Sequence, residues 1–208
     1  MTSGSISLRW QYLLNDAYNT YFRRSRRIAD AGFVPVSGLT TDSEYVTDAR
    51  ASATVWLRNI DRLIKASGID TRKFHFLDVG CGKGVSTLYA QDQFRFAGMS
   101  GFDFDERLLA IAKENRDRSR VRNKAAVNFF SGDAGKIRIP EQRTFCFLFN
   151  PFGPVVLNLF IANNIDMLRS TGSVIGYANC RELHVLDRFP GVRINKVERF
   201  NSAAVSFV

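Results

Sequence analysis

The sequence predicts a doubly wound α/β fold, in which helices cover both faces of a seven-stranded, mostly parallel sheet. From Phe74 onward, short apolar runs alternate with helical patterns, as they do where right-handed crossovers join parallel strands. Residues 144–150, TFCFLFN, are apolar on both faces, which is typical of a central parallel strand. Residues 192–208 contain two strand-like runs around a turn near Asn201, so we expect an antiparallel hairpin to close the sheet.

The remaining elements follow one another regularly along the chain. Further strands are expected at residues 74–79, 94–104, 127–133 and 173–179. Helices are expected between them at residues 84–92, 105–118, 155–169 and 181–189. Asp105 comes directly before the helical run ERLLAIAKEN, and we expect its side chain to cap that helix.

Residues 1–72 have a different pattern from the rest of the chain. Apolar residues at helical spacing predict a first helix over about residues 8–28, and a second is expected over about 51–66. Between them, residues 33–50 are rich in Pro, Gly, Ser and Thr and predict a loop. We expect residues 1–72 to form a helical lid over the functional site of a domain that spans residues 73–208.

The chain is basic, with a formal net charge of +9 and a sequence pI of about 9.8. Such a surface attracts nucleic acid, anionic lipid or an acidic metabolite, or simply keeps a protein in solution. The densest basic cluster is RRSRR at residues 23–27. It suits RNA, a phosphorylated metabolite or an anionic membrane face, and a solvated helix end is the alternative.

Cysteine and histidine usage narrows the class of protein. The cysteines Cys81, Cys146 and Cys180 are odd in number and have no CxxC spacing, so we expect reduced thiols and a cytoplasmic protein. His75 and His184 stand alone, without the clustered ligands of a metal site, so no metal is expected. The N-terminus lacks a signal-peptide pattern, and no run approaches the roughly 18 apolar residues of a membrane span.

Residues 76–84, FLDVGCGKG, place a glycine turn directly after a strand. Glycine adopts positive φ and lets a ligand approach the backbone, and the N–H groups of the following helix point at that ligand. A dinucleotide site requires GxGxxG, but Val85 occupies the position of the third glycine and the spacing is GxGxG. Asp78 also fits poorly beside a pyrophosphate, and it fits well beside a cofactor that carries an amino group and a sulfonium cation.

Four segments resemble motifs of the class I S-adenosylmethionine-dependent methyltransferases, a family with a Rossmann-like fold. DVGCGKG resembles the first motif, GFDFDERLLAIAKEN the second, NFFSGDAGKI the third and FLFNPFG the fourth. They occur in the family's order over about residues 74–180. The wider pattern resembles a group of small bacterial methyltransferases. The resemblance implies methyl transfer from S-adenosylmethionine to an O or N acceptor in a small molecule, RNA or protein.

The resemblance also implies a role for each motif residue in holding the cofactor. Asp78 is expected near the methionine part and Asp103 at the two ribose hydroxyls, where a carboxylate accepts two donors side by side. The remaining residues expected at the cofactor are Gly80, Gly82 and Gly84 as a backbone wall, Phe104 on the adenine face, Asp133 at the adenine amine, Ala134 through its backbone, and Asn150. Alternatives stay open, since Asp78 could cap a helix, Asp105 could replace Asp103 at the ribose, and Asp133 could be a turn residue.

Asn150 is the candidate catalytic residue. With the carbonyl of Pro151 it could accept the hydrogens of an amino group, while Phe152 stacks on a planar substrate. NPFG resembles the NPPY and DPPY signatures of amino methyltransferases but lacks their second proline, and a strand-ending turn is the alternative. Tyr45 could also reach the site of methyl transfer from the polar loop. The competing functions are a non-catalytic, RNA-binding module of the same fold and an NAD(P)-dependent oxidoreductase, which Val85 disfavours.

Overall fold

The computed structural model describes residues 3–29, 32–39, 44–50, 55–123, 125–197 and 200–208. Its strands are β1 (His75–Val79), β2 (Gly98–Asp103), β3 (Val127–Ser131), β4 (Thr144–Phe149), β5 (Val174–Ala178), β6 (Val192–Val197) and β7 (Ser202–Phe207). Its α-helices are α1 (Ser3–Arg26), α2 (Arg58–Ser67), α3 (Val85–Gln93), α4 (Glu106–Arg118) and α5 (Pro154–Thr171). Short 3₁₀ turns occur at η1 (Val36–Gly38), η2 (Val46–Asp48), η3 (Thr71–Lys73) and η4 (Leu183–Arg188).

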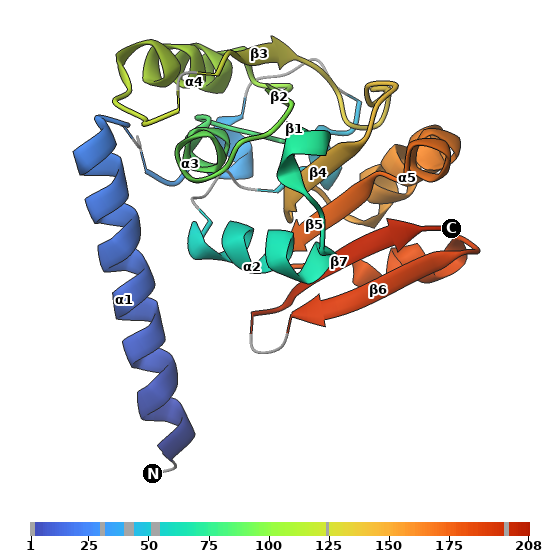
Figure 1. Cartoon of the computed structure of the whole chain (residues 1–208), viewed down its shortest axis with the longest axis horizontal. Coiled ribbons are helices and arrows are strands. Elements are labelled where there is room, and N and C mark those ends of the chain that lie inside the picture. Colours follow the sequence, from blue (N-terminus) through green and yellow to red (C-terminus); the bar gives the residue numbers. More distant parts are fainter. Residues whose placement is uncertain (1–2, 30–31, 40–43, 51–54, 124, 198–199) are drawn as a thin grey trace.

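In the part of the chain described, one seven-stranded sheet has the order β3-β2-β1-β4-β5-β7-β6 (Figure 1). Strands β1 to β5 are parallel, and β7 runs antiparallel to both β5 and β6. The predicted fold class is therefore confirmed, including the closing hairpin. The first strand along the chain, β1, lies in the middle of the sheet. The next two strands extend the sheet outward to β3, and β4 then lies on the other side of β1.

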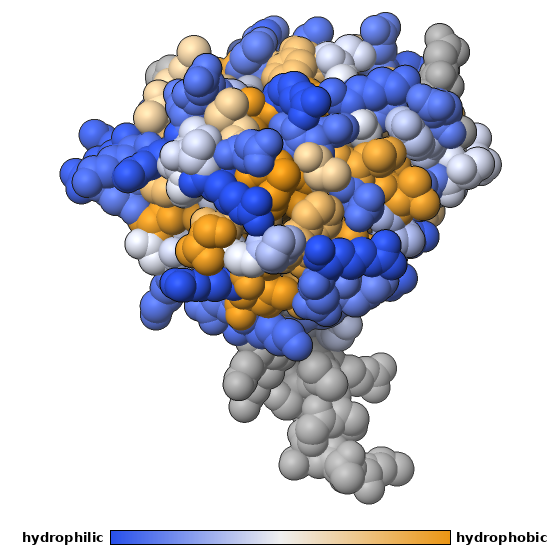
Figure 2. All heavy atoms as spheres, turned by 90° about the vertical axis from the view of Figure 1, so that its right-hand side faces the viewer, coloured by the Kyte–Doolittle hydropathy of each residue, from blue (hydrophilic) through white to orange (hydrophobic). Residues whose placement is uncertain are grey.

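Helices cover both faces of the sheet because the central strands are apolar on both sides. In β4, Phe145 and Phe147 pack in the cluster shared with α2 and α3, whereas Cys146 and Leu148 pack in the cluster shared with α5. This alternation follows from the two-residue period of a strand. Figure 2 shows the molecule from the right-hand side of Figure 1, where polar surface surrounds scattered apolar patches.

Helix ends follow local capping chemistry. Asp105 caps α4, because its Oδ1 accepts the backbone N–H groups of Arg107 at 3.0 Å and Leu108 at 3.4 Å, which confirms the predicted N-cap. Pro154 is the first residue of α5, where a backbone N–H would have no partner within the helix. Gly172 ends the helix in the left-handed conformation.

Two helices differ from the expected ones. The segment around residues 183–188 is a 3₁₀ turn, because it is short and Pro190 follows closely, and i→i+3 bonds suit such short pieces. The second helix begins at Arg58, and residues 51–54 of its expected range lie outside the described residues. None of the described helices is both long and apolar enough to cross a membrane.

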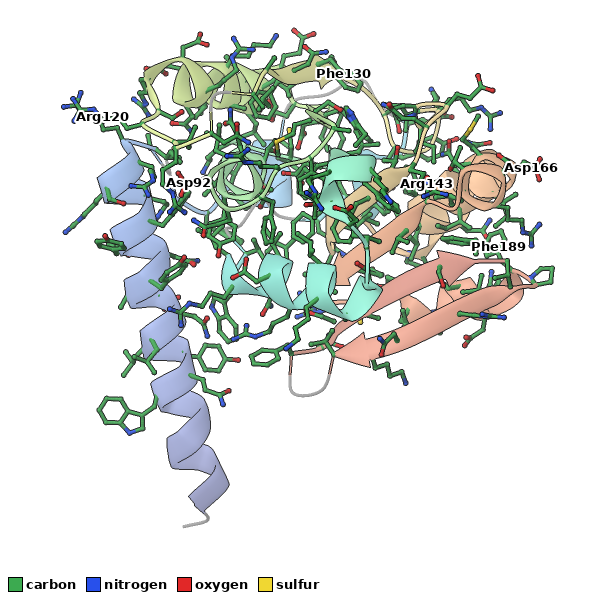
Figure 3. The ribbon with its side chains drawn as sticks, viewed as in Figure 1. Asp92, Arg120, Phe130, Arg143, Asp166 and Phe189 are labelled. Atoms are coloured by element: carbon green, nitrogen blue, oxygen red, sulfur yellow. The ribbon has the colours of Figure 1, made fainter. Side chains whose placement is uncertain are left out.

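The second half of α1 packs against the body of the protein. Asn19 donates from Nδ2 to the Val55 carbonyl at 2.8 Å and accepts the Leu57 N–H on Oδ1 at 3.1 Å. At the end of the helix, Nε of Arg26 lies 2.8 Å from Oδ1 of the buried Asp92. Figure 3 shows Asp92 between α1 and α3. These contacts fix the direction in which the chain leaves α1 toward the edge of the sheet.

Candidate functional site

A pocket lies beyond the carboxyl ends of β1, β2 and β4. β1 and β4 are neighbours in the sheet, and the chain leaves them in opposite directions, so the pocket sits at the topological switch point where open α/β sheets bind ligands. The residues that line it are Gly32, Leu39, Arg50, Asp78, Gly80, Cys81, Gly82, Lys83, Val85, Ser86, Phe102, Asp103, Phe104, Leu108, Gly132, Ala134, Phe149, Pro151 and Phe152. Every turn that follows a parallel strand from β1 to β4 contributes to this lining.

The glycine turn after β1 forms one wall of the pocket. The N–H groups of Gly80 and Cys81 both donate to the Phe102 carbonyl, at 3.0 and 2.9 Å, which ties the turn to the end of β2. Gly80 has φ of 72°, and a Cβ on it would lie 2.7 Å from the Cβ of Pro151. Only glycine fits there, because both the backbone conformation and the space exclude a side chain.

Asp103 stands at the end of β2 as a buried carboxylate. Its Oδ2 accepts the Gly82 N–H at 2.8 Å and its Oδ1 accepts the Asp105 N–H at 3.0 Å. Burial raises the pKa of Asp103 above its ordinary value, although these N–H donors oppose the rise. The Phe104 N–H also bonds to this carboxylate, so about one of its four acceptor positions remains.

Asp78 is a second buried carboxylate on the same pocket. Thr87 donates its hydroxyl to Oδ2 at 2.6 Å, and its backbone N–H also bonds to the carboxylate. Thr87 lies in the first turn of α3, so Asp78 accepts one of the unpaired N–H groups at the start of that helix and also lines the pocket. Burial, with a smaller contribution from the charge of Asp103, raises the pKa of Asp78 to about 7.

Phe104 and Ala134 also line the pocket, but three predicted residues are absent from its lining. Gly84 instead caps α3 with φ of 75°, and a Cβ there would lie 2.7 Å from Cζ of Phe129, so it permits helix–sheet packing. Asp133 accepts the Gly135 N–H on Oδ1 at 2.8 Å, as a turn residue does. The third is Asn150.

The Asn150 amide is directed to the interior of the protein. Its Oδ1 accepts the hydroxyl of Tyr177 at 3.2 Å, and its backbone has φ of 42° in the left-handed region. The Pro151 carbonyl accepts the N–H of Arg50 at 3.0 Å. Each of the two oxygens that an amino substrate would need therefore already accepts one hydrogen bond, whereas Pro151 and Phe152 line the pocket.

Residues 48–50 lie beside the NPFG loop and bring Arg50 to the pocket. Ala49 pairs with Phe152 in an isolated antiparallel bridge, and Asp48 accepts the Val156 N–H on Oδ2 at 2.8 Å, in the first turn of α5. Arg50 then reaches the pocket, with its Nη2 2.9 Å from Oε1 of Glu182.

Residues 32–39 lie on the other side of the pocket, and Gly32 and Leu39 line it. Asn115 binds both the N–H and the carbonyl of Ala29, at 2.8 and 2.9 Å. Lys83 donates to the Gly32 carbonyl and Arg107 to the Gly38 carbonyl. The proposed covering role of residues 1–72 stays a prediction, but its described parts 32–39 and 44–50 do contribute pocket residues.

A methyltransferase-domain family matches residues 76–172, the segment that carries the glycine turn, Asp103 and the NPFG loop. This match and the order of the four motifs support a class I S-adenosylmethionine-dependent methyltransferase. This methyltransferase is 29% identical over 150 residues to malonyl-[acyl-carrier protein] O-methyltransferase of Bacillus anthracis, covering 68% of this chain and 51% of that relative.

Solved structures share the fold of this methyltransferase. TrmN from Thermus thermophilus aligns with a TM-score of 0.54 at 19% identity, over 71% of this chain and 48% of that one. A SAM-dependent methyltransferase from Aquifex aeolicus aligns with a TM-score of 0.53 at 16% identity, over 71% of this chain and 89% of that one. The chain thus spans about half the length of the Bacillus relative and of the Thermus protein.

The other sequence candidates lie elsewhere in the methyltransferase. His75 starts β1, at the amino ends of the parallel strands and away from the pocket, and its Nε2 lies 2.6 Å from Ser100 Oγ. His184 is exposed in η4. Tyr45 packs over Gly135, where a Cβ would lie 2.8 Å from its ring. Among the described residues, no group of three or more His, Cys, Asp or Glu side chains could hold a metal ion.

Sequence reasoning missed Arg50 and Lys83. The sequence did offer a signal for Lys83, because it is the one charged residue inside the glycine turn Gly80–Gly84. In the structure Lys83 is buried and donates to the Gly32 carbonyl. No local sequence pattern marks Arg50 as a pocket residue. Its position depends on the pairing of Ala49 with Phe152, which lies about 100 residues further along the chain.

Proposed function

We propose that this methyltransferase binds S-adenosylmethionine in the pocket at the switch point and transfers its methyl group to an oxygen acceptor, an ionised carboxylate. The observation that carries the proposal is the pair of buried carboxylates, Asp78 and Asp103, beside a turn that only glycine can form. A finer assignment of the acceptor rests on Arg50 and on the engaged Asn150.

The residues present fit this cofactor. Two acidic side chains with raised pKa values face one pocket, and their ionised forms are favoured by a ligand that brings an ammonium and a sulfonium cation. Asp103 lines the pocket and keeps an acceptor position for a ribose hydroxyl beside its three backbone N–H donors. Phe104 lies beside Asp103 in the pocket wall and offers a ring to a base.

When bound, S-adenosylmethionine supplies an electrophilic methyl group. The tasks left to this chain are to align an acceptor with that group and to exclude water. Pro151 and Phe152 shape the acceptor side of the pocket, and Leu39 lies among the covering residues. An ionised carboxylate held at Arg50 would accept that methyl group without first losing a proton.

An oxygen acceptor accounts for the chemistry of the described lining. It contains no histidine, and its acidic residues are Asp78 and Asp103 on the cofactor side, so an alcohol would meet no obvious base. An amine would have to share the oxygens of Asn150 and Pro151 with Tyr177 and Arg50, and Asn150 is absent from the pocket lining. A carboxylate needs a cation, and the Arg50 guanidinium at the pocket has further N–H donors besides the one bound to Glu182. The Bacillus relative is itself named as an O-methyltransferase of malonyl-[acyl-carrier protein].

Calorimetry tests the cofactor half of the proposal. S-adenosylmethionine and S-adenosylhomocysteine should bind, and NADH should not. Asp103→Ala should weaken this binding by about 2–4 kcal/mol, as expected for the loss of hydrogen bonds to a charged group. Unchanged binding by Asp103→Ala would remove Asp103 from the site.

Methyl transfer tests the acceptor half. Mass spectrometry should detect esters when short and long carboxylates are offered with S-adenosylmethionine. N-methylated amines or RNA as the only products would overturn the carboxylate assignment and leave the cofactor assignment standing.

A further inference from the structure

Helix α1 has an apolar face that the rest of the protein does not use. Its inner face is occupied, since Phe22 packs on Tyr89 with ring centroids 5.0 Å apart and Asn19 bonds the chain before α2. The face turned away carries Trp10, Leu13, Leu14, Ala17, Thr20, Tyr21 and Arg24, which we term the outer stripe. Figure 1 shows that the N-terminal half of α1 extends well beyond the sheet and the other helices.

The outer stripe is large and exposed. Trp10 is 62% exposed, Leu13 60%, Leu14 63% and Tyr21 70%. Its members recur at the three- and four-residue spacing that aligns side chains along one side of a helix. A shallow groove runs between Leu13 and Arg24 on this side. Contiguous apolar surface of this kind is typical of an interface, whereas single exposed apolar residues are not.

We propose that the outer stripe is the interface of a homodimer, in which two α1 helices pack antiparallel about a two-fold axis at Ala17. The stripe is symmetric about that residue, because positions 10 and 24, 13 and 21, and 14 and 20 are equally far from 17. A two-fold interface requires this self-complementarity, since the same patch is used by both copies.

The pairs produced by this symmetry are chemically compatible. Trp10 meets Arg24 of the second copy, which suits a cation–π contact. Leu13 meets the ring of Tyr21, and Leu14 meets the methyl group of Thr20, in the second copy. Ala17 meets itself at the axis, where a small side chain allows the two helix axes to approach closely.

Charge sets the antiparallel direction. The last turn of α1 carries Arg23, Arg24 and Arg26, and its first turn carries no acidic residue. Parallel helices would bring these basic ends together, whereas antiparallel helices place them at opposite ends of the dimer. The two bodies also stay apart, because each packs on the inner face of its own helix.

The available area is adequate for a specific contact. A buried aromatic side chain contributes roughly 150–250 Å². Two such side chains and two leucines from each copy, at the exposures above, approach the roughly 1,000 Å² that marks a specific interface. An anionic bilayer suits the stripe less well, because Asp16 lies in the same groove and Arg26 is held by Asp92.

Sedimentation velocity on the full chain tests the dimer. We expect a concentration-dependent dimer, and Leu13→Glu should weaken association by about tenfold or more, as for a central interface residue. Tyr12→Ser is the matched control, because Tyr12 lies on the opposite side of α1 against Trp56, with ring centroids 4.5 Å apart. A wild-type chain that stays monomeric at all concentrations overturns the proposal, as does equal weakening by the control.

Oxidative cross-linking tests the arrangement, and it is interpretable because Cys81, Cys146 and Cys180 are all buried. With diamide as oxidant, Ala17→Cys should cross-link to itself, and Leu13→Cys should cross-link to Tyr21→Cys in a mixture. Self-cross-linking of Leu13→Cys alone would indicate parallel helices and overturn the antiparallel pair. Binding of the monomer to phosphatidylserine vesicles, abolished by Leu13→Glu, would assign the stripe to a membrane and overturn the dimer.

Discussion

At the scale of single residues, Asp78 links the stability of the protein to its pH. The folded-state pKa of about 7 exceeds the ordinary value of 3.8, because burial disfavours the charged carboxylate. The protonated form therefore stabilises the folded state fully below about pH 4, and this contribution is lost as the pH rises through about 7. A buried anion without a cationic ligand thus opposes folding at neutral pH.

Asp78→Asn should raise the melting temperature of the ligand-free protein at pH 8 and change it little at pH 5. The asparagine Oδ1 can still accept the Thr87 hydroxyl, so the helix contact survives. The same variant should bind S-adenosylmethionine more weakly at pH 8, because it offers no charge to the cationic part. Scanning calorimetry at the two pH values checks the first effect, and a higher melting temperature for wild type at pH 8 would contradict it.

Gly80→Ala tests the close approach of the glycine turn to the NPFG loop. The new Cβ would lie 2.7 Å from Pro151, and the left-handed backbone adds strain of roughly 1–2 kcal/mol. Gly172→Ala is the control, since its φ of 67° is similar but a Cβ there meets nothing within 4 Å. Urea unfolding should show a larger loss for Gly80→Ala, and equal losses would mean that contact with Pro151 contributes nothing.

Arg50→Gln should raise the KM for a carboxylate acceptor by about tenfold to a hundredfold, the usual effect of losing a hydrogen bond to a charged group. The affinity for S-adenosylmethionine should stay nearly unchanged, because Arg50 lies on the acceptor side. Arg72→Gln is the matched control, as Arg72 forms its ion pair with Asp70 outside the pocket lining. A fall in kcat with an unaltered KM would argue against a role in acceptor binding.

At the scale of elements, the start of α5 depends on a residue from the distant N-terminal segment. Asp48 accepts the Val156 N–H on Oδ2, and its carbonyl accepts the Gly153 N–H at 2.7 Å. These bonds fasten the 44–50 segment to the NPFG loop, and so they hold Arg50 at the pocket.

Asp48→Ala should lower the free energy of unfolding by about 1 kcal/mol, as the loss of a helix cap does. Hydrogen exchange of residues 44–50 should accelerate in the same variant. Asp48→Asn retains an acceptor at Oδ1 and should behave nearly as wild type. Unchanged exchange in Asp48→Ala would show that the Ala49–Phe152 bridge alone fastens the segment.

The elements that sequence patterns predicted well are those whose signal is local. Strands β1 and β4, helix α4 and its cap at Asp105 follow from periodicity and capping chemistry. Asp103 and Gly80 were placed at a strand end and in a glycine turn, and both line the pocket. Their assigned contacts with a cofactor remain predictions.

Patterns failed where a position depends on packing between distant segments. Asn150 stands at the end of β4 as expected, yet its side chain turns toward Tyr177 on the neighbouring β5. Gly84 belongs to the quoted motif but faces Phe129 on β3. Gly32, Leu39 and Arg50 reach the pocket through contacts that no local sequence window contains.

At the scale of the whole molecule, residues close in the site are far apart along the chain. The pocket joins the segment around Gly32 to the loop at Phe152, and the sheet is parallel except at one end. Such non-local contacts slow folding, because long loops must close before the contacts form.

Strand β7 occupies the place between β5 and β6, although it follows both in the chain. During synthesis, β6 therefore leaves the ribosome before the strand to which it must bond exists. Until residues 202–207 have emerged, the edge of β5 stays open and β6 has no ladder partner. A ribosome stalled just before this stretch would carry a nascent chain with two unpaired strands, the kind of species that chaperones recognise.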